Sequence, residues 1–342
     1  MQPFQYLRQD NAGQAAQADY WQGVDRTQPS VAAPAQYLAG GTTLIDLMRL
    51  NVMTPHTVID INPMAAGLDT ISFDRQRGLR LGGLTRMSDA ADHPAVREHY
   101  PVIAQSLNLA ASPQIRTMAS LAGNVLQRTR CNYFRDVSYT ECNKRNPGSG
   151  CAALEGVNRR HAVLGVSDNC IATYAGDFAQ ALIALDAIVK ISGPQGERRL
   201  AFAKLHRLPG DTPQIETDLA PGELITGFTV PAADWTRRSM YLKVRDRESY
   251  EFALASAAVA LEMDGNVVHR ARIALGGVSA VPWRAKEAEN ALAGKVLDDE
   301  ALNAAAEAAF RTAMPRGDNA FKIELGKRTL IRAIRQTAAL EL

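Results

Sequence analysis

The four cysteines of the chain are its clearest candidates for chemistry, because its 342 residues contain no others and all four lie between 131 and 170. Clustered cysteines bind zinc or iron–sulfur clusters, pair as disulfides, or pack as small apolar side chains. Their spacing is C-x10-C, C-x8-C and C-x18-C, without the close C-x2-4-C pairs typical of zinc sites. The residues are Cys131, Cys142, Cys151 and Cys170.

The surroundings of these cysteines narrow the alternatives without selecting one. Arg128, Arg130, Lys144, Arg145 and Asn146 are poor neighbours for a thiol in an apolar core. A disulfide needs an oxidising compartment, and the N-terminus lacks the basic and apolar stretches of a signal peptide, so we expect none. Zinc and an iron–sulfur cluster both stay open from the spacing alone.

A second candidate site is a glycine turn in the sequence YLAGGTTL, between an expected strand at 36–39 and an expected helix at 44–50. Adjacent glycines let the backbone turn tightly and approach an anion closely. The free N–H groups at the start of the following helix favour such an anion. The residues are Tyr37, Leu38, Ala39, Gly40, Gly41, Thr42, Thr43 and Leu44.

A second loop of small residues, ASLAGN, contains Ser120, Gly123 and Asn124. It also permits close backbone approach, and the Asn amide can bind a ribose or diphosphate oxygen. Neither loop matches the G-x-G-x-x-G or P-loop pattern, which argues against a Rossmann site. Two separate loops closing on one extended diphosphate fit the sequence better.

Composition sets the outer limits. Apolar residues make up 46% and charged residues 22%, as in globular proteins, and the length allows two domains. The net charge of +2 is too small to indicate nucleic-acid binding, and no apolar run is long enough to span a membrane.

The order of strand and helix patterns predicts an α+β fold. We expect a short helix at 4–8, a hairpin turning near Arg77-Gly78, and two helices divided at Pro101. Beyond Pro231, alternating residues around Asp264-Gly265-Asn266 predict an antiparallel sheet. Three helices then follow, near 283–292, 298–311 and 321–336, and we place the domain boundary near 230.

The order of YLAGGTTL, ASLAGN, PGELITGFTVP and YLKVRDR resembles the FAD-binding subunits of the molybdenum hydroxylases, the xanthine dehydrogenase family, from about 35 to 340. The cysteine segment resembles that of the periplasmic aldehyde oxidoreductases, whose flavin subunit carries an extra [4Fe–4S] cluster. It is less similar to 4-hydroxybenzoyl-CoA reductase, which has another cysteine spacing. Ala122 departs from the family pattern, where many members have a second glycine.

The resemblance implies a two-subdomain FAD-binding domain of the PCMH type at 1–230, with a four-cysteine [4Fe–4S] segment inserted at about 128–171. A C-terminal domain of antiparallel sheet and helices would follow at 231–342. It implies that the four cysteines hold the cluster and that FAD binds without a covalent bond. Besides the two loops, the implied FAD contacts are Ala110, Asp136, Ile225 and Lys243.

The function that the resemblance implies is electron transfer, with no catalytic residue on this chain. A partner with the molybdenum cofactor would oxidise an aldehyde to a carboxylic acid, and a [2Fe–2S] partner would pass electrons to this FAD, in a heterotrimer. The external acceptor would be ferredoxin, quinone or oxygen. The location would be cytoplasmic, or periplasmic by export with a signal-bearing partner.

Two functions of other classes stay open beside electron transfer. A free-standing flavoprotein oxidase would act on its own small substrate. A non-catalytic scaffold would use the cysteines to bind zinc. Metal and flavin analysis distinguishes all three.

Overall fold

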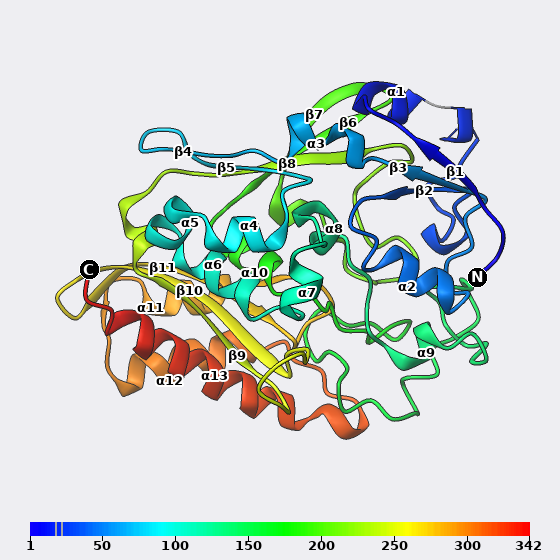
Figure 1. Cartoon of the computed structure of the whole chain (residues 1–342). Helices are drawn as coiled ribbons and strands as arrows, with labels where there is room; N and C mark the ends of the chain where they lie inside the picture. Colours follow the sequence, from blue (N-terminus) through cyan, green and yellow to red (C-terminus); the bar gives the residue numbers. More distant parts are fainter. Residues whose placement is uncertain (18, 22) are drawn as a thin grey trace.

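A three-stranded parallel sheet forms one end of the computed structural model, which describes residues 1–17, 19–21 and 23–342 (Figure 1). Its order is β1 (Gln5–Arg8), β3 (Thr57–Asp60), β2 (Ala35–Leu38). The expected helix at 4–8 is therefore wrong: that segment is β1, whose backbone pairs with β3 in register from Gln5 opposite Thr57. Long-range pairing overrides local preference in such a short segment.

The second sheet has five strands in the order β4–β5–β8–β6–β7, all antiparallel to their neighbours. The predicted hairpin at Arg77-Gly78 is confirmed as the β4–β5 connection, and Gly78 has φ +86°. The strands are β4 (Ile71–Asp74), β5 (Gly78–Gly82), β6 (Ile188–Gly193), β7 (Gly196–Ala201) and β8 (Leu224–Val230).

A layer of helices packs against this second sheet, and the two layers share one large apolar core. The predicted break at Pro101 is confirmed, because α5 (Pro94–His99) ends just before α6 (Pro101–Asn108) begins. Proline is tolerated there because the first turn of a helix needs no N–H donor. The other helices are α4 (Met87–Asp92), α7 (Pro113–Arg116), α8 (Leu121–Val125) and α10 (Phe178–Ala184).

The C-terminal part is an antiparallel sheet with three helices, as predicted. The long hairpin of β10 (Ala255–Asp264) and β11 (Val267–Gly276) forms its centre, with β9 (Ser239–Val244) beside β10. Two-residue strands, β12 (Trp283–Arg284) and β13 (Lys295–Val296), pair with β11. The helices are α11 (Lys286–Leu292), α12 (Asp299–Phe310) and α13 (Phe321–Ala338).

Both faces of this C-terminal sheet are covered, which binds the two parts of the chain together. The helices α11 to α13 pack on one face, and α6 and α10 contact β9 and β11 on the other (Figure 1). The first seven residues of β10 are all buried, and alanine dominates them. Small side chains let helices approach both faces of a strand closely.

The cysteine segment between α8 and α10 is mostly irregular and contains one short helix, α9 (Asn132–Arg135). Phe134 and Cys142 pack into an apolar cluster with α2 (Leu44–Arg49) and β3, which fixes the segment against the first sheet. The remaining short elements are α1 (Ala12–Gln17), α3 (Ala65–Leu68) and 3-10 turns at Asp19–Trp21, Ser30–Ala32, Asn62–Met64, Phe202–Lys204, Asp234–Arg237 and Gly317–Asn319.

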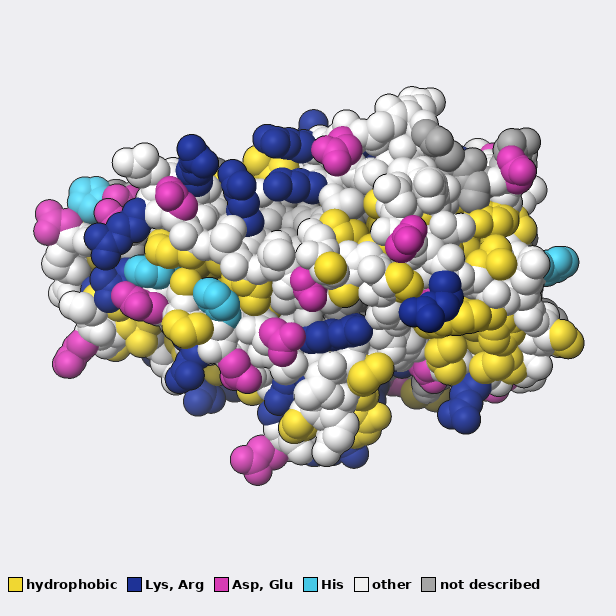
Figure 2. All heavy atoms as spheres, turned by 45° about the horizontal axis from the view of Figure 1, so that its top comes forward, with side chains coloured by type: hydrophobic (Ala, Val, Ile, Leu, Met, Phe, Trp, Pro, Cys, Tyr) yellow, Lys and Arg dark blue, Asp and Glu magenta, His cyan; other side chains and the backbone are white. Residues whose placement is uncertain are grey.

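The surface charge and the helix lengths agree with the small net charge and the lack of long apolar runs in the sequence. Figure 2 shows side chains of both charge signs interspersed over the face that it draws. Among the described residues, no helix is long and apolar enough to cross a bilayer.

Candidate functional site: a large cavity beside a cysteine cluster

A large cavity, of about 370 Å³, opens between the first sheet, α8 and the β8 region. This volume is in the range of cofactor pockets. Most of the residues that the sequence predicted for FAD line it. They are Tyr37, Ala39, Gly40, Gly41, Thr42, Thr43, Leu44, Ser120, Gly123 and Ile225.

The glycine turn forms one wall of the cavity, where Gly40 and Gly41 need no space for side chains. Gly41 has φ +74°, a conformation that favours glycine, and it connects β2 to α2. A Cβ on Gly40 would lie 2.0 Å from the carbonyl oxygen of Met118, just before the second loop. The two predicted loops are therefore in direct backbone contact.

The second loop is the start of α8, which Ser120 caps. The Ser120 hydroxyl accepts a hydrogen bond from the Gly123 N–H at 3.2 Å. The Asn124 amide instead donates to the Met87 sulfur at 3.3 Å, and Asn124 does not line the cavity. Its amide oxygen is buried and has no hydrogen-bond partner among the residues that the structure describes.

Tyr37 lines the large cavity and connects β2 to two segments distant in sequence. Its single O–H donor lies within hydrogen-bond distance of two carbonyl oxygens, those of Gly222 at 2.9 Å and Ala15 at 3.2 Å. Its ring lies 5.1 Å from that of Trp21, centroid to centroid. Burial raises the pKa of Tyr37, so the phenol is neutral near pH 7.

Five predicted FAD residues do not line the cavity, and Lys243 is the clearest case. Its ammonium is buried and pairs with Asp177 at 2.7 Å and with the Leu109 carbonyl at 3.0 Å. Asp136 is exposed and accepts hydrogen bonds from the Ser138 hydroxyl and N–H, which lower its pKa. The five are Leu38, Ala110, Asn124, Asp136 and Lys243.

Several cavity residues had no signal in the sequence as FAD contacts. The cavity is lined by three charged residues, Arg128, Lys144 and Glu216. The sequence indicates Arg128 and Lys144 only as neighbours of the cysteines, and it gives no indication of Glu216. Trp21 lies in a polar stretch that gave no indication of a site. Their positions depend on the packing of distant segments.

All four cysteines line a second, much smaller cavity, which the structure places directly beside the first. All four are free thiols, with Cys142 and Cys170 buried and the other two partly buried. This cavity holds about 10 Å³, roughly the space of one water molecule. Lys144, Cys170 and Ala172 line both cavities, so the two sites share a wall.

The thiols interact with one another and with a histidine. A hydrogen bond from Cys170 lowers the pKa of Cys151 to about 7 and raises that of Cys170. Burial raises the pKa of Cys131 to about 12. His161 Nε2 lies 3.2 Å from the Cys131 sulfur, and burial, followed by the charge of Lys322, lowers the pKa of His161 to about 4.

The four thiols share one cavity, but they are not arranged as a metal-ion site in the part of the chain that the structure describes. No three His, Cys, Asp or Glu side chains of the described residues are arranged to hold one metal ion.

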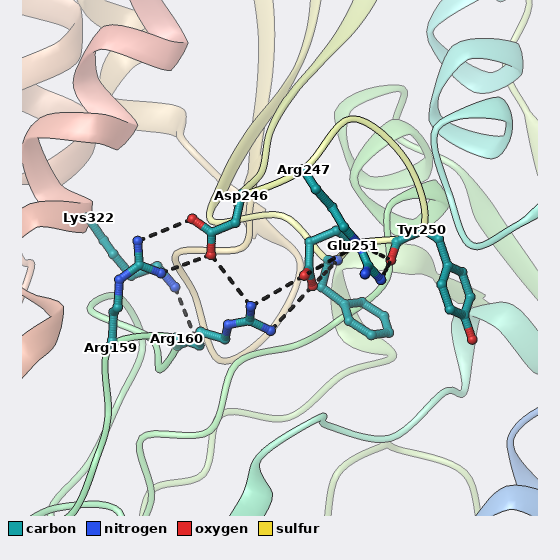
Figure 3. Close-up of polar contacts among 8 residues, drawn as sticks. Arg159, Arg160, Asp246, Arg247, Tyr250, Glu251 and Lys322 are labelled. Atoms are coloured by element: carbon teal, nitrogen blue, oxygen red, sulfur yellow. Dashed lines mark hydrogen bonds and ion pairs between the residues drawn. The ribbon is translucent and has the colours of Figure 1, made fainter.

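The C-terminal part holds the cysteine segment in place through a charged network (Figure 3). Arg159 pairs with Asp246 at 3.0 Å, and Arg160 pairs with Glu251 at 3.3 Å, so these arginines serve the surface contact instead of facing the thiols. Lys322 on α13 is fully buried, and its ammonium donates to the carbonyls of Arg160, His161 and Gly277.

Comparison with known proteins defines the class. Residues 12–233 match the FAD binding domain in molybdopterin dehydrogenase, and residues 240–337 match the CO dehydrogenase flavoprotein C-terminal domain. The chain therefore belongs to the FAD-binding subunits of the molybdenum hydroxylase family, and it is an oxidoreductase subunit that binds FAD.

The chain is also similar to individual members of this family. It is 46% identical to the aldehyde oxidoreductase FAD-binding subunit PaoB of Escherichia coli, over 89% of this chain and 92% of that one. It is 25% identical to the glyceraldehyde dehydrogenase medium chain of Sulfolobus acidocaldarius, over 98% of both. The carbon monoxide dehydrogenase structure from Hydrogenophaga pseudoflava superposes with a TM-score of 0.74 at 25% identity, over 99% of this chain and 98% of that chain.

Proposed function

We propose that this chain is the FAD and [4Fe–4S] electron-transfer subunit of a molybdenum-dependent aldehyde oxidoreductase. One observation carries the proposal: the large cavity and the cysteine cavity share a wall, formed by Lys144, Cys170 and Ala172. Redox groups in two such cavities would lie close enough for electrons to pass between them. The similarity to an aldehyde oxidoreductase subunit supports the substrate class.

The residues at the large cavity would bind FAD without a covalent bond. The two loops in backbone contact would hold the diphosphate with N–H groups and the hydroxyls of Thr42 and Thr43. Leu38, Ala110, Asn124, Asp136 and Lys243, which lie outside the cavity wall, would be further FAD contacts. The FAD-binding domain would span 1–230 and the C-terminal domain 231–342. The redox chemistry is supplied by the bound flavin, and the chain positions it.

The four cysteines would hold the cluster. Four thiols that line one cavity, next to the buried cations Arg128 and Lys144, match the donor chemistry and the negative charge of a [4Fe–4S] centre. The cavity of about 10 Å³ does not itself have the volume of a cluster, so the donor chemistry of the four thiols is what supports this assignment.

The chain would work in a heterotrimer. A molybdenum-cofactor subunit would convert the aldehyde to a carboxylic acid, and a [2Fe–2S] subunit would pass the electrons to this chain. Ferredoxin, quinone or oxygen would be the acceptor. The complex would be cytoplasmic, or periplasmic through export with a signal-bearing partner.

Co-purification tests this assembly against the free-standing oxidase. Tagged chain expressed with its genomic neighbours should carry two further subunits, one with molybdenum, and aldehyde should reduce its flavin only when both are present. A single active chain would favour the oxidase. Zinc without iron or flavin would favour the scaffold.

A further inference from the structure

Three charged side chains, Arg128, Lys144 and Glu216, form a buried cluster where the two cavities meet. The Lys144 ammonium lies 3.0 Å from one Glu216 carboxylate oxygen, and the Arg128 guanidinium contacts the other. The side chains of Arg128, Lys144 and Glu216 are only 9%, 12% and 20% exposed. Two cations and one anion give this triad a net charge of +1.

The triad faces both cavities. Arg128 and Glu216 line the large cavity, and Lys144 lines both that cavity and the cysteine cavity, next to Cys170. Both terminal nitrogens of Arg128 are buried, and neither has a hydrogen-bond partner among the described residues. The guanidinium of Arg128 thus has donors available for a group bound in the large cavity.

Buried charges are screened only weakly, so they act on a neighbouring redox group over several ångströms. Reduction adds negative charge, which a nearby cation stabilises and a nearby anion opposes. A charge cluster in a common wall must therefore act on both redox groups with the same sign.

We propose that the Arg128–Glu216–Lys144 triad sets the reduction potentials of the flavin and the cluster together, in proportion to its net charge. The proposal depends on the proposed function, because it requires both groups to bind. It assigns to Glu216 a tuning role and not a role in holding either cofactor.

Charge-changing variants of the full-length chain test this proposal by redox titration, with the flavin followed by its visible bands and the cluster by electron paramagnetic resonance. K144M reduces the net charge of the triad to 0, and we expect both midpoint potentials to become more negative. E216Q raises the net charge to +2, and both should become more positive. The double variant K144M/E216Q restores +1, and both potentials should return toward wild type.

A second Lys–Glu pair provides the matched control. Lys327 on α13 lies 2.6 Å from Glu307 on α12, and neither residue lines either cavity. K327M and E307Q change charge in the same way, so we expect both potentials to stay at the wild-type values.

Iron and flavin contents, measured first, separate the possible failures. Wild-type chain without iron or FAD would refute the proposed function itself. Shifts of the same sign in K144M and E216Q, or no shift with both cofactors bound, would refute the triad's role alone. If K144M loses its cluster, the near-isosteric E216Q decides: a positive shift supports the proposal and an unchanged potential overturns it.

Discussion

Gly40 is the residue at which the two loops of the large cavity meet, and it has no room for a methyl group. We predict that G40A loses FAD and unfolds more easily, by at least about 1–3 kcal/mol, because overpacking against backbone cannot relax through a side chain. Flavin absorbance per chain and chemical unfolding measure both effects. G67A is the control, because among the described residues the added Cβ would meet no heavy atom within 4 Å beyond its chain neighbours and its own helix backbone. Equal flavin content in both variants would contradict the prediction.

Cys142 tests the cluster at the same scale. We predict that C142S loses most of its iron and the broad cluster absorbance but keeps the flavin bands, because Cys142 lines only the cysteine cavity. Full retention of iron would remove Cys142 from the ligand set. Equal loss of flavin would mean that the segment is mainly structural.

Individual site residues could be predicted from the sequence where the signal is local. The glycine turn and the cap at Ser120 combine residues close together in the chain, and both line the cavity. Lys243 shows the limit, because its partner Asp177 is 66 positions away and no local pattern indicates it. Arg128 and Glu216 meet for the same reason: only the folded chain brings them together.

Among the elements, α13 connects the C-terminal part to the cysteine segment through Lys322. Three carbonyl acceptors suit an ammonium, but burial, aided by Arg159 and Arg160, lowers its pKa to about 7 from 10.5. Between these values the unfolded chain binds the extra proton, so the free energy of unfolding should rise with pH.

We predict that K322M removes this rise. From pH 7.5 to 9.5, wild type should gain stability relative to K322M by up to about 1.4 kcal/mol per pH unit. Chemical unfolding at several pH values measures the difference between the two proteins. Parallel pH curves for wild type and K322M would contradict a lowered pKa of Lys322 in the folded chain.

Most elements could be predicted from the sequence because their apolar periodicity is clear. The β10–β11 hairpin, the break at Pro101 and the last two C-terminal helices occur where the pattern places them. The helix expected at 283–292 begins only at Lys286, because Trp283–Arg284 pair with β11 as the strand β12. The failure at β1 concerns four residues whose conformation is set by pairing with β3, more than 50 positions away. The irregular cysteine segment also has no periodicity from which its path could be predicted.

At the scale of the whole molecule, the fold brings two sites together that lie on different segments. The cysteine segment packs against the first sheet through Phe134, and α13 holds its other side through Lys322. The segment is thereby fixed beside the large cavity, with a wall in common. Under the proposed function, this arrangement would let the chain act in electron transfer mainly by placing the two redox groups beside each other.

The most direct test of this account is the iron and flavin content of the full-length chain, purified without oxygen, together with its visible spectrum. The account predicts about four irons and about one FAD per chain, with flavin bands above a broad cluster absorbance. Protein that is colourless and free of iron, and that stays so after reconstitution with iron, sulfide and FAD, would contradict it.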